Sequence, residues 1–434
     1  MSMRAPAILY VHDLRGSGVV TNAIALARRL GAERETLLVA GYDKGLNRAI
    51  DVAPARLVVL SGSDEPRRPR LRAAVKLRTL VRESGASLVM SMGNFGHSSV
   101  FFATPGLGVH TVYRISNEIG RPQAGLRNMR RRSWQRLLLA TATRIVLVGR
   151  ALAESPLFEG AVKSGRAVYI PNGIDLERAT KGAAAPSPHP WLDDKGPPVV
   201  LTIGRIHVQK NLEGLIEGAA LAARQRPLRL AIVGSGEEQY RERLTRLAEA
   251  NGLELLFAGE TDNVFAWLAR ADLFALVSHW EGSSTALLEA IALDVPVVAS
   301  RQAGDAAHVL DDGRYGQLVD ADDPASIAAD NEELDRHILL GRLQRRAVDR
   351  EFIDWTEGWL TRIIAANHRH RVYDDDGLAY VCGLFWVRAC NAGARGSDRA
   401  HGWRRLVSSS MGRGLFNREG RYAFAANQAA RRSL

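Results

Sequence analysis

Short runs of aliphatic and β-branched residues alternate with longer amphipathic stretches along the first part of the chain. Six of these runs have the length and composition of buried strands: residues 7–11, 36–40, 56–60, 87–91, 111–115 and 144–148. Strands that alternate with helices in this way are typical of a parallel sheet with helices on both faces. The pattern therefore predicts the α/β class.

A proline-rich segment at residues 181–198 interrupts the alternation. Its prolines stand among small residues at positions 186, 188, 190, 197 and 198, and we expect it to be a linker between domains. The alternation then resumes, with strands predicted at 199–203, 229–233, 253–257, 273–278 and 295–299. The sequence thus predicts a first domain over residues 1–180 and a second over residues 199–353.

The segment from Glu281 to Glu289 combines a small polar turn with the start of an apolar helix. Gly282, Ser283 and Ser284 stand at this helix start, where backbone N–H groups and the helix dipole form a site for phosphate oxygens. The flanking carboxylates do not suit phosphate, but they accept hydrogen bonds from sugar and ribose hydroxyls. This combination indicates a site for a nucleotide-sugar.

Two cations occur in the loop that follows the predicted strand 199–203. Arg205 comes directly after Gly204, and Lys210 precedes the helix expected from about Asn211. Open α/β sheets bind their ligands at the carboxyl ends of strands. A guanidinium and an ammonium there can clamp two linked phosphates and stabilise the charge that develops as they leave. A solvated basic loop is the alternative interpretation.

Four motifs follow one another along the chain. They are Tyr169-Ile170-Pro171-Asn172-Gly173-Ile174-Asp175, then Gly204-Arg205 with Lys210, then Val233-Gly234-Ser235-Gly236, and then the 281–289 segment. In this order and spacing they resemble the retaining glycosyltransferases of family 4, over about residues 5–370. Residues 287–293 and 312–316 look most like bacterial members that build lipopolysaccharide cores and surface polysaccharides.

The resemblance implies the GT-B fold, in which two Rossmann-like domains enclose a cleft and a last helix, here about 354–369, crosses back to the first domain. It implies transfer of a hexosyl or N-acetylhexosaminyl group from a nucleoside diphosphate-sugar, with UDP the expected nucleotide, to a glycan or lipid-linked acceptor. No bound metal or other cofactor is expected. Glu281 would hold donor-sugar hydroxyls, Glu289 the ribose, and Arg205 with Lys210 the diphosphate.

Two loops of the first domain would face the cleft in this family. Gly16 and Gly18 follow the first strand, where the family loop meets the donor diphosphate or the acceptor. The local sequence lacks the family's two adjacent glycines and acidic residue, and a simple tight turn is the alternative. Arg114, Asn117 and Glu118 end another strand and are predicted donor or acceptor contacts. Ordinary polar loop residues are the alternative there, and the histidine common at this place in the family is absent.

The formal net charge of +11 is unevenly distributed along the chain. Residues 371–434 contain 11 Arg and no Lys against 4 Asp and 1 Glu, a net charge of +6. We expect this segment to be a basic extension outside both domains. It would be either a solvated or disordered tail or a surface for anionic lipid or another acidic partner.

Basic residues also cluster in the first domain, at positions 67–78 and around Trp134 at 127–136. Such clusters suit anionic lipid headgroups, and solvated helix faces are the alternative. Only two cysteines, no apparent signal peptide and no apolar stretch near the roughly 20 residues of a spanning helix predict a cytoplasmic protein. We expect it at the inner face of the cytoplasmic membrane. No nucleic-acid partner is expected, because no recognition helix or base-stacking module occurs.

Two other function classes remain open from the sequence. Nucleotide-sugar epimerases share this architecture and would also place carboxylates near the donor, but they need no acceptor. A non-catalytic basic protein that binds membranes through its extension is the third class.

Overall fold

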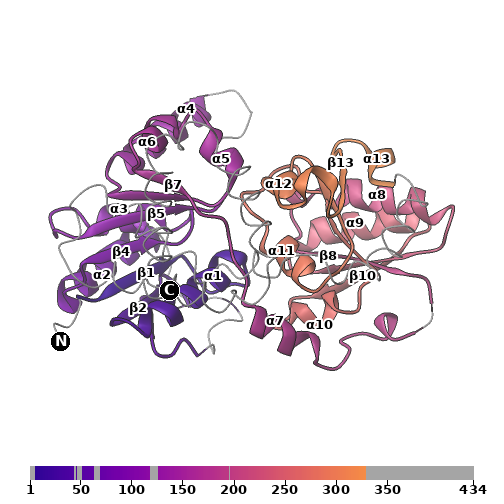
Figure 1. Cartoon of the computed structure of the whole chain (residues 1–434), viewed down its shortest axis with the longest axis horizontal. Helices are drawn as coiled ribbons and strands as arrows, with labels where there is room; N and C mark the ends of the chain where they lie inside the picture. Colours follow the sequence, from indigo (N-terminus) through magenta and orange to yellow (C-terminus); the bar gives the residue numbers. More distant parts are fainter. Residues whose placement is uncertain are drawn as a thin grey trace, which may run out of the picture. The chain divides into compact units, whose positions relative to one another are not determined.

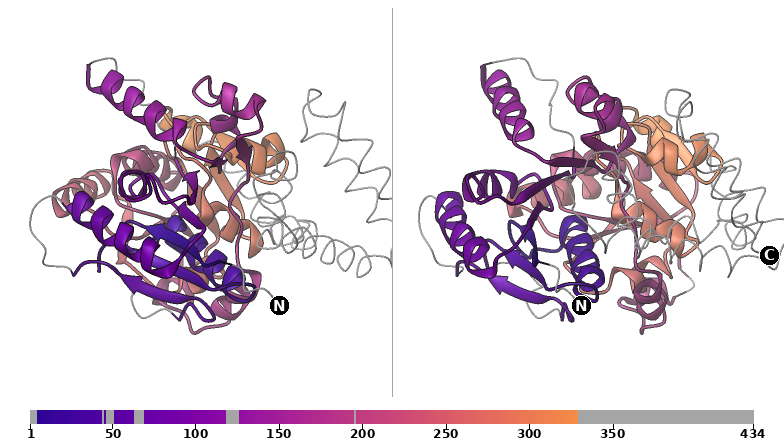
Figure 2. Two further views of the ribbon diagram at one scale, coloured as in Figure 1. Left: turned by 90° about the vertical axis from the view of Figure 1, so that its left-hand side faces the viewer. Right: turned by 60° about the vertical axis from the view of Figure 1, so that its left-hand side comes forward.

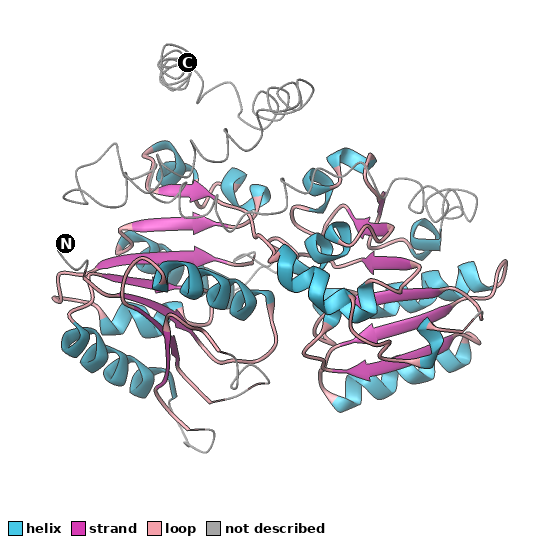
Figure 3. Ribbon diagram, turned by 60° about the horizontal axis from the view of Figure 1, so that its bottom comes forward, coloured by secondary structure: helices cyan, strands magenta, loops and turns pink. Residues whose placement is uncertain are grey.

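The computed structural model describes residues 5–43, 45, 51–62, 69–117, 126–194 and 196–328. Within these residues the chain forms two parallel sheets with helices packed against each of them (Figures 1 and 3). The α/β class predicted from the alternation of strands and helices is therefore confirmed. Glu118, the expected crossover helix at 354–369 and the basic extension at 371–434 lie outside the described residues.

The first sheet has seven parallel strands in the order β3-β2-β1-β4-β5-β6-β7. The strands are β1 Ala7–Val11, β2 Thr36–Ala40, β3 Arg56–Val59, β4 Leu88–Ser91, β5 His110–Ile115, β6 Arg144–Leu147 and β7 Ala167–Tyr169. All six predicted strands are confirmed, with ends shifted by one residue at most. Only β7 was not expected, because its three residues are too few to show a pattern.

Helices of 5 to 16 residues accompany this sheet. They are α1 Gly18–Gly31, α2 Pro69–Ser84, α3 His97–Ala103, α4 Leu126–Ala140, α5 Arg150–Glu154, α6 Glu159–Lys163 and α7 Leu176–Ala183. Helices α2 and α3 pack together along one another (Figure 2). Helix α7 extends into the beginning of the predicted linker, and the rest of that segment contains the 3₁₀ helix η2 at Pro190–Leu192.

The second sheet has six parallel strands in the order β10-β9-β8-β11-β12-β13. The strands are β8 Val199–Ile203, β9 Arg229–Val233, β10 Glu254–Gly259, β11 Leu273–Leu276, β12 Val297–Ser300 and β13 Gln317–Val319. The helices are η3 Val208–Lys210, α8 Leu212–Ala223, α9 Glu238–Ala250, α10 Val264–Leu268, α11 Thr285–Ala292, α12 Ala306–Val309, η4 Asp311–Gly313 and α13 Pro324–Ala328. The short strand β13 was not predicted.

Both faces of the second sheet are buried, which explains the uninterrupted apolar runs of its strands. Val199 and Leu201 of β8 face a core that α10 and α11 complete. Val200, between them, faces the opposite core beneath α8 and α9. Successive side chains of a strand point to opposite faces, so a strand covered on both sides has no polar face to alternate with.

The strand order places two loops next to each other. β8 pairs with β9 on one side and with β11 on the other, so the chain direction across the sheet reverses between β8 and β11. The loops that follow these two strands leave the same edge of the sheet. This is the position at which open α/β sheets bind their ligands.

Candidate functional site

The loops after β8 and β11 bring Lys210 and Glu281 into direct contact. Lys210 Nζ lies 2.7 Å from Glu281 Oε1, and the Ser278 hydroxyl donates to the same oxygen at 3.0 Å. The two charged side chains are only 15% and 11% exposed. Two of the three predicted catalytic residues therefore contact each other at a mostly buried site, although 71 positions separate them in sequence.

The path of Lys210 depends on Gly204. This glycine has φ 153°, a conformation that favours glycine. A Cβ atom added to it would lie 2.7 Å from Lys210 Cε. A side chain at this position would therefore displace the ammonium from Glu281, which explains why a glycine precedes Arg205.

Arg205, the third predicted catalytic residue, is exposed and lies in the same loop as Lys210. Its guanidinium donates to Gln209 Oε1 at 3.2 Å, and Gln209 Nε2 donates to the Trp280 carbonyl at 2.9 Å. Gln209 is 5% exposed and thus joins the β8 loop to the β11 loop. The sequence analysis did not single out Gln209, although its place beside Lys210 in the cationic loop was a signal for it.

Residues 282–284 lead into helix α11, as the sequence predicted. Ser284 is the N-cap, and its hydroxyl accepts from the Leu287 N–H at 3.4 Å. Gly282 packs closely on the loop after β5, because a Cβ atom there would lie 2.4 Å from the Ser116 carbonyl oxygen. The first turn of α11 contains no acidic residue, so its positive dipole end is available to an anion.

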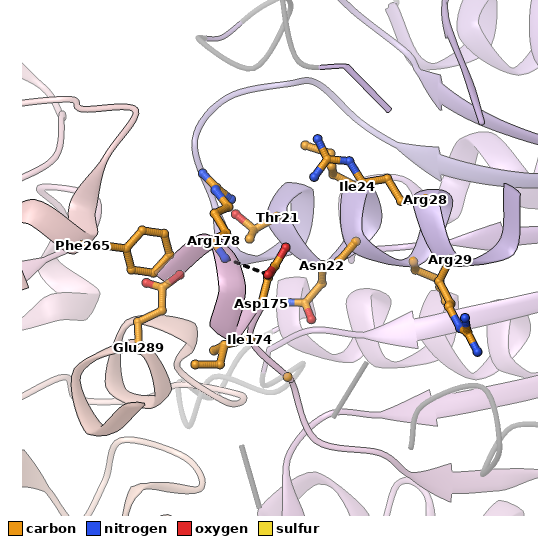
Figure 4. Close-up of a pocket in the computed structure, with 13 residues that line it drawn as sticks. Thr21, Asn22, Ile24, Arg28, Arg29, Ile174, Asp175, Arg178, Phe265 and Glu289 are labelled. Atoms are coloured by element: carbon orange, nitrogen blue, oxygen red, sulfur yellow. Dashed lines mark hydrogen bonds between the residues drawn. The ribbon is translucent and has the colours of Figure 1, made fainter. Parts of the chain in front are cut away.

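Glu289 lies in the second turn of α11, at a small pocket separate from the Lys210–Glu281 pair (Figure 4). The pocket has a volume of about 40 Å³, and residues of α1, the start of α7, Phe265 and Glu289 line it. Glu289 is 8% exposed. Burial raises its pKa to about 7, although the positive charge of Arg178 acts in the opposite direction.

No residue in the described part of the chain donates a hydrogen bond to the Glu289 carboxylate. A buried carboxylate without a donor is costly, and ligand hydroxyls would supply the missing hydrogen bonds. Arg178 lies near the ring of Phe265, with 5.6 Å between the guanidinium carbon and the ring centroid. The geometry of this pocket is thus suited to a group that carries hydroxyls.

The two glycines predicted after β1 have different surroundings. Gly16 is exposed, and a Cβ atom there would meet nothing within 4 Å. Gly18 begins α1, and a Cβ atom there would lie 2.3 Å from the Thr285 hydroxyl oxygen at the start of α11. The β1–α1 loop therefore reaches the helix start that was predicted to bind phosphate.

Arg114, a predicted donor or acceptor contact, is buried and hydrogen-bonded within the protein. It is 1% exposed, donates to the Met92 carbonyl at 2.8 Å and hydrogen-bonds Asn172 Oδ1. Burial lowers its pKa to about 9, so it remains charged at neutral pH. Asn117 is half-buried, and its carbonyl accepts from Asn94 at 3.1 Å. The predicted ligand contacts of these residues remain predictions.

Asp305 is a further polar group that the sequence analysis did not identify. It follows β12, is 2% exposed, accepts from the Tyr169 hydroxyl at 2.9 Å and hydrogen-bonds the Arg150 N–H. Burial raises its pKa to about 6, while its hydrogen bonds act in the opposite direction. Asp305 therefore links the second sheet to two elements of the first.

Neither a metal cluster nor a spanning helix occurs in the described part of the chain. No group of three or more His, Cys, Asp or Glu side chains is arranged to hold a metal ion among those residues. None of the described helices is both long and apolar enough to cross a membrane.

Two family models match the chain. Residues 16–178 match the model described as Glycosyltransferase Family 4, and residues 197–335 match the model described as Glycosyl transferases group 1. The first match covers the first sheet from β2 to β7, and the second covers all strands of the second sheet. The matched residues include the Gly16–Gly18 loop, Arg205, Lys210 and the whole 281–289 segment.

Curated relatives match over part of their length. The chain is 32% identical to the lipopolysaccharide core biosynthesis glycosyltransferase LpsE of Rhizobium meliloti over 166 residues, which are 35% of this chain and 47% of that protein. It is 28% identical over 170 residues to an N-acetyl-D-galactosaminyltransferase of Campylobacter jejuni, with coverage of 38% and 47%. The matched segments span about half the length of these relatives.

Solved structures share the fold at low sequence identity. HepE of Anabaena, determined with UDP and glucose, has a TM-score of 0.64 and 15% identity over 89% of this chain and 100% of that chain. WaaG, described as a glycosyltransferase involved in lipopolysaccharide biosynthesis, has a TM-score of 0.63 and 15% identity, with coverage of 84% and 100%. The GT-B architecture expected from the motifs is therefore confirmed, and the chain belongs to the glycosyltransferases of family 4.

Proposed function

We propose that the protein transfers a sugar from a UDP-sugar, with retention of configuration, to a lipid-linked acceptor during the synthesis of lipopolysaccharide or another bacterial surface glycan. The observation that carries this proposal is the Lys210–Glu281 pair, 2.7 Å apart, beside the start of helix α11. A cation, a carboxylate and a helix dipole meet there within one loop cluster. The names of the relatives support the choice of a glycan pathway, and the UDP in the HepE structure supports the nucleotide.

The proposed donor would lie across both parts of the site. Lys210 and Arg205 would hold the diphosphate, and the N–H groups of residues 283 and 284 would bind its oxygens. An ammonium has three N–H donors, so Lys210 can keep Glu281 and still bind phosphate. The second oxygen of Glu281 would then accept from a hydroxyl of the sugar, while Glu289 would accept from the ribose.

The proposed reaction breaks the bond between the anomeric carbon and the phosphate oxygen, and the bonding electrons move onto the departing UDP. The acceptor oxygen bonds to the same face of the anomeric carbon, and its proton passes to the departing phosphate. Lys210, Arg205 and the dipole of α11 stabilise the charge that grows on this phosphate. These groups would fulfil the role that a divalent metal has in other transferases.

A basic and aromatic surface of the first domain would bring the enzyme to its acceptor. The rings of Phe101, Phe102 and Trp134 lie within 5.1–5.7 Å of one another between α3 and α4. Exposed apolar side chains on α2–α4 include Leu71, Val75, Phe102, Met129 and Leu137. Together with the exposed Arg72 of α2 and Arg136 of α4, they suit peripheral contact with an anionic membrane at its cytoplasmic face.

Two measurements on the full chain test this function. Thermal-shift screening against UDP-, GDP- and ADP-sugars should show selective stabilisation by UDP-sugars, and product analysis with the best donor should show an unchanged anomeric configuration. Lys210→Ala should abolish transfer. UDP release without any acceptor, together with isomerised sugar, would indicate an epimerase. The absence of stabilisation by every nucleotide-sugar would contradict the donor site.

A further inference from the structure

Asn172 connects the first sheet to the loop that starts helix α11. It lies between β7 and α7 and is 5% exposed. Its Nδ2 donates to the Ser283 carbonyl at 2.7 Å, across 111 positions of sequence. Its Oδ1 accepts from the Arg114 guanidinium. Both ends of this amide are therefore engaged, and neither faces solvent.

Arg114 fixes which way the Asn172 amide points. A guanidinium has only donors, so the oxygen of the amide must face it and the nitrogen must face Ser283. Arg114 is itself held by its bond to the Met92 carbonyl at 2.8 Å at the end of β4. The orientation of Asn172 is thus determined by a charged side chain that is only 1% exposed.

The bond to the Ser283 carbonyl also orients the next N–H group. A peptide unit is planar and trans, so the C=O of Ser283 and the N–H of Ser284 point in opposite directions. Because the Ser283 carbonyl is held toward Asn172, the Ser284 N–H points away from Asn172. Among the described residues, it donates to no protein oxygen.

We propose that Asn172, oriented by Arg114, is a positioning residue that aims the Ser284 N–H at the donor diphosphate. This inference rests on the proposed function, because it assigns the α11 start to the diphosphate. Asn172 does not touch the substrate itself. It acts by fixing one peptide unit, so its loss should affect the binding of phosphate more than the binding of the nucleoside.

Asn172→Asp separates this role from a general loss of stability. The aspartate can still accept from Arg114, so the buried guanidinium keeps a partner. It cannot donate to the Ser283 carbonyl when ionised, and its second oxygen repels that carbonyl. Asn251→Ala is the matched control, because Asn251 also donates one bond, at 2.8 Å to the Leu247 carbonyl, but lies at the end of α9.

Calorimetric titration with UDP and with uridine gives the first readout. We expect Asn172→Asp to lower the affinity for UDP by at least about tenfold, which corresponds to the loss of one hydrogen bond to a charged group. Uridine affinity should remain as in the wild type, and Asn251→Ala should leave both ligands unchanged. Unchanged UDP affinity in Asn172→Asp would overturn the inference, as would an equal loss for UDP and uridine.

Amide hydrogen exchange of residues 282–287 gives a readout that does not depend on transfer. Exchange in this segment should become faster in Asn172→Asp and stay unchanged in Asn251→Ala. If wild-type protein neither binds UDP nor transfers sugar, the proposed function fails. Faster exchange would then still support the anchoring of the loop but would refute its link to a diphosphate. Unchanged exchange would overturn the anchoring itself.

Discussion

The raised pKa of Glu289 predicts how nucleoside binding depends on pH. Burial moves this pKa to about 7, so the carboxyl loses its proton within the neutral range. A carboxylate accepts hydrogen bonds from two hydroxyls, whereas the protonated acid has a weaker acceptor and a competing donor. Ribose hydroxyls should therefore bind better as the pH rises.

The magnitude follows from the fraction of ionised Glu289. With a pKa of about 7, about a tenth is ionised at pH 6 and about nine tenths at pH 8. If only the carboxylate binds ribose, uridine should bind about tenfold more tightly at pH 8 than at pH 6. The sign for folding is opposite. An acid with a raised pKa lowers the stability of the folded state as pH rises from about 4 to about 7.

Calorimetric titration with uridine tests this dependence. Uridine is chosen over UDP because phosphate titrates near pH 6 and would add its own pH dependence. Glu289→Gln should bind uridine with no change between pH 6 and 8, and 2′,3′-dideoxyuridine should show no change with the wild type. Arg178→Gln should shift the dependence of uridine affinity to higher pH. The positive charge of Arg178 favours the ionised Glu289 carboxyl, and its removal raises the Glu289 pKa further.

Two results would refute the reasoning. Uridine affinity that is flat between pH 6 and 8 in the wild type would mean that Glu289 does not meet the ribose. An equal slope in Glu289→Gln would mean that another group titrates. Because the pocket is small and Glu289 is 8% exposed, a global change of structure over this pH range should be checked by circular dichroism.

Four further predictions concern the same site and its surroundings. Glu281→Ala should impair sugar transfer by roughly 10- to 100-fold but leave the affinity for free UDP nearly unchanged in calorimetry, because its proposed partner is the sugar; an equal loss of UDP affinity would contradict this. Activity in excess EDTA should stay within about twofold of the untreated level, and a loss that Mg²⁺ restores would contradict it. Sedimentation with anionic liposomes should weaken as salt rises, since the Debye length falls from about 30 Å at 0.01 M to about 8 Å at 0.15 M; equal binding to neutral liposomes would exclude the basic surface. The wild type should lose about 3 kcal/mol of stability as pH rises from about 4 to about 6, because the raised pKa of Asp305 favours the folded state with this carboxyl protonated. Thermal unfolding of Asp305→Asn should not show this loss.

The sequence predicted the elements of the fold better than the partners within the site. Strands of four residues or more contain apolar runs that are long enough to recognise, but β7 and β13 have three residues each and depend on pairing with neighbours. Strand 295–299 was predicted two residues too early at its start. Pro296 has no N–H for the ladder, and the strand begins at Val297.

Site residues were predictable where a motif implied a chemical role, and not where tertiary contacts decided the role. Lys210 and Glu281 were assigned to one site, but their 2.7 Å contact depends on the pairing of β8 with β11. Arg114 was predicted to contact a ligand because it ends a strand that would face the cleft in the resembled family. Its partners, Met92 and Asn172, lie 22 and 58 positions away. Nothing in the local sequence indicates such a pairing.

The contacts of the β11 loop connect the proposed donor site to the association of the two sheets. Ser116 packs against Gly282, Asn172 holds the Ser283 carbonyl, and Asp305 binds Tyr169 of β7. Each contact joins an element of the first sheet to the loops after β11 or β12. A ligand that binds these loops only in the associated arrangement also favours that arrangement. A substitution that populates the dissociated arrangement lowers the apparent ligand affinity by the fraction that remains associated. By this coupling, Tyr169→Phe, which removes the hydrogen bond to Asp305, should reduce the affinity for UDP.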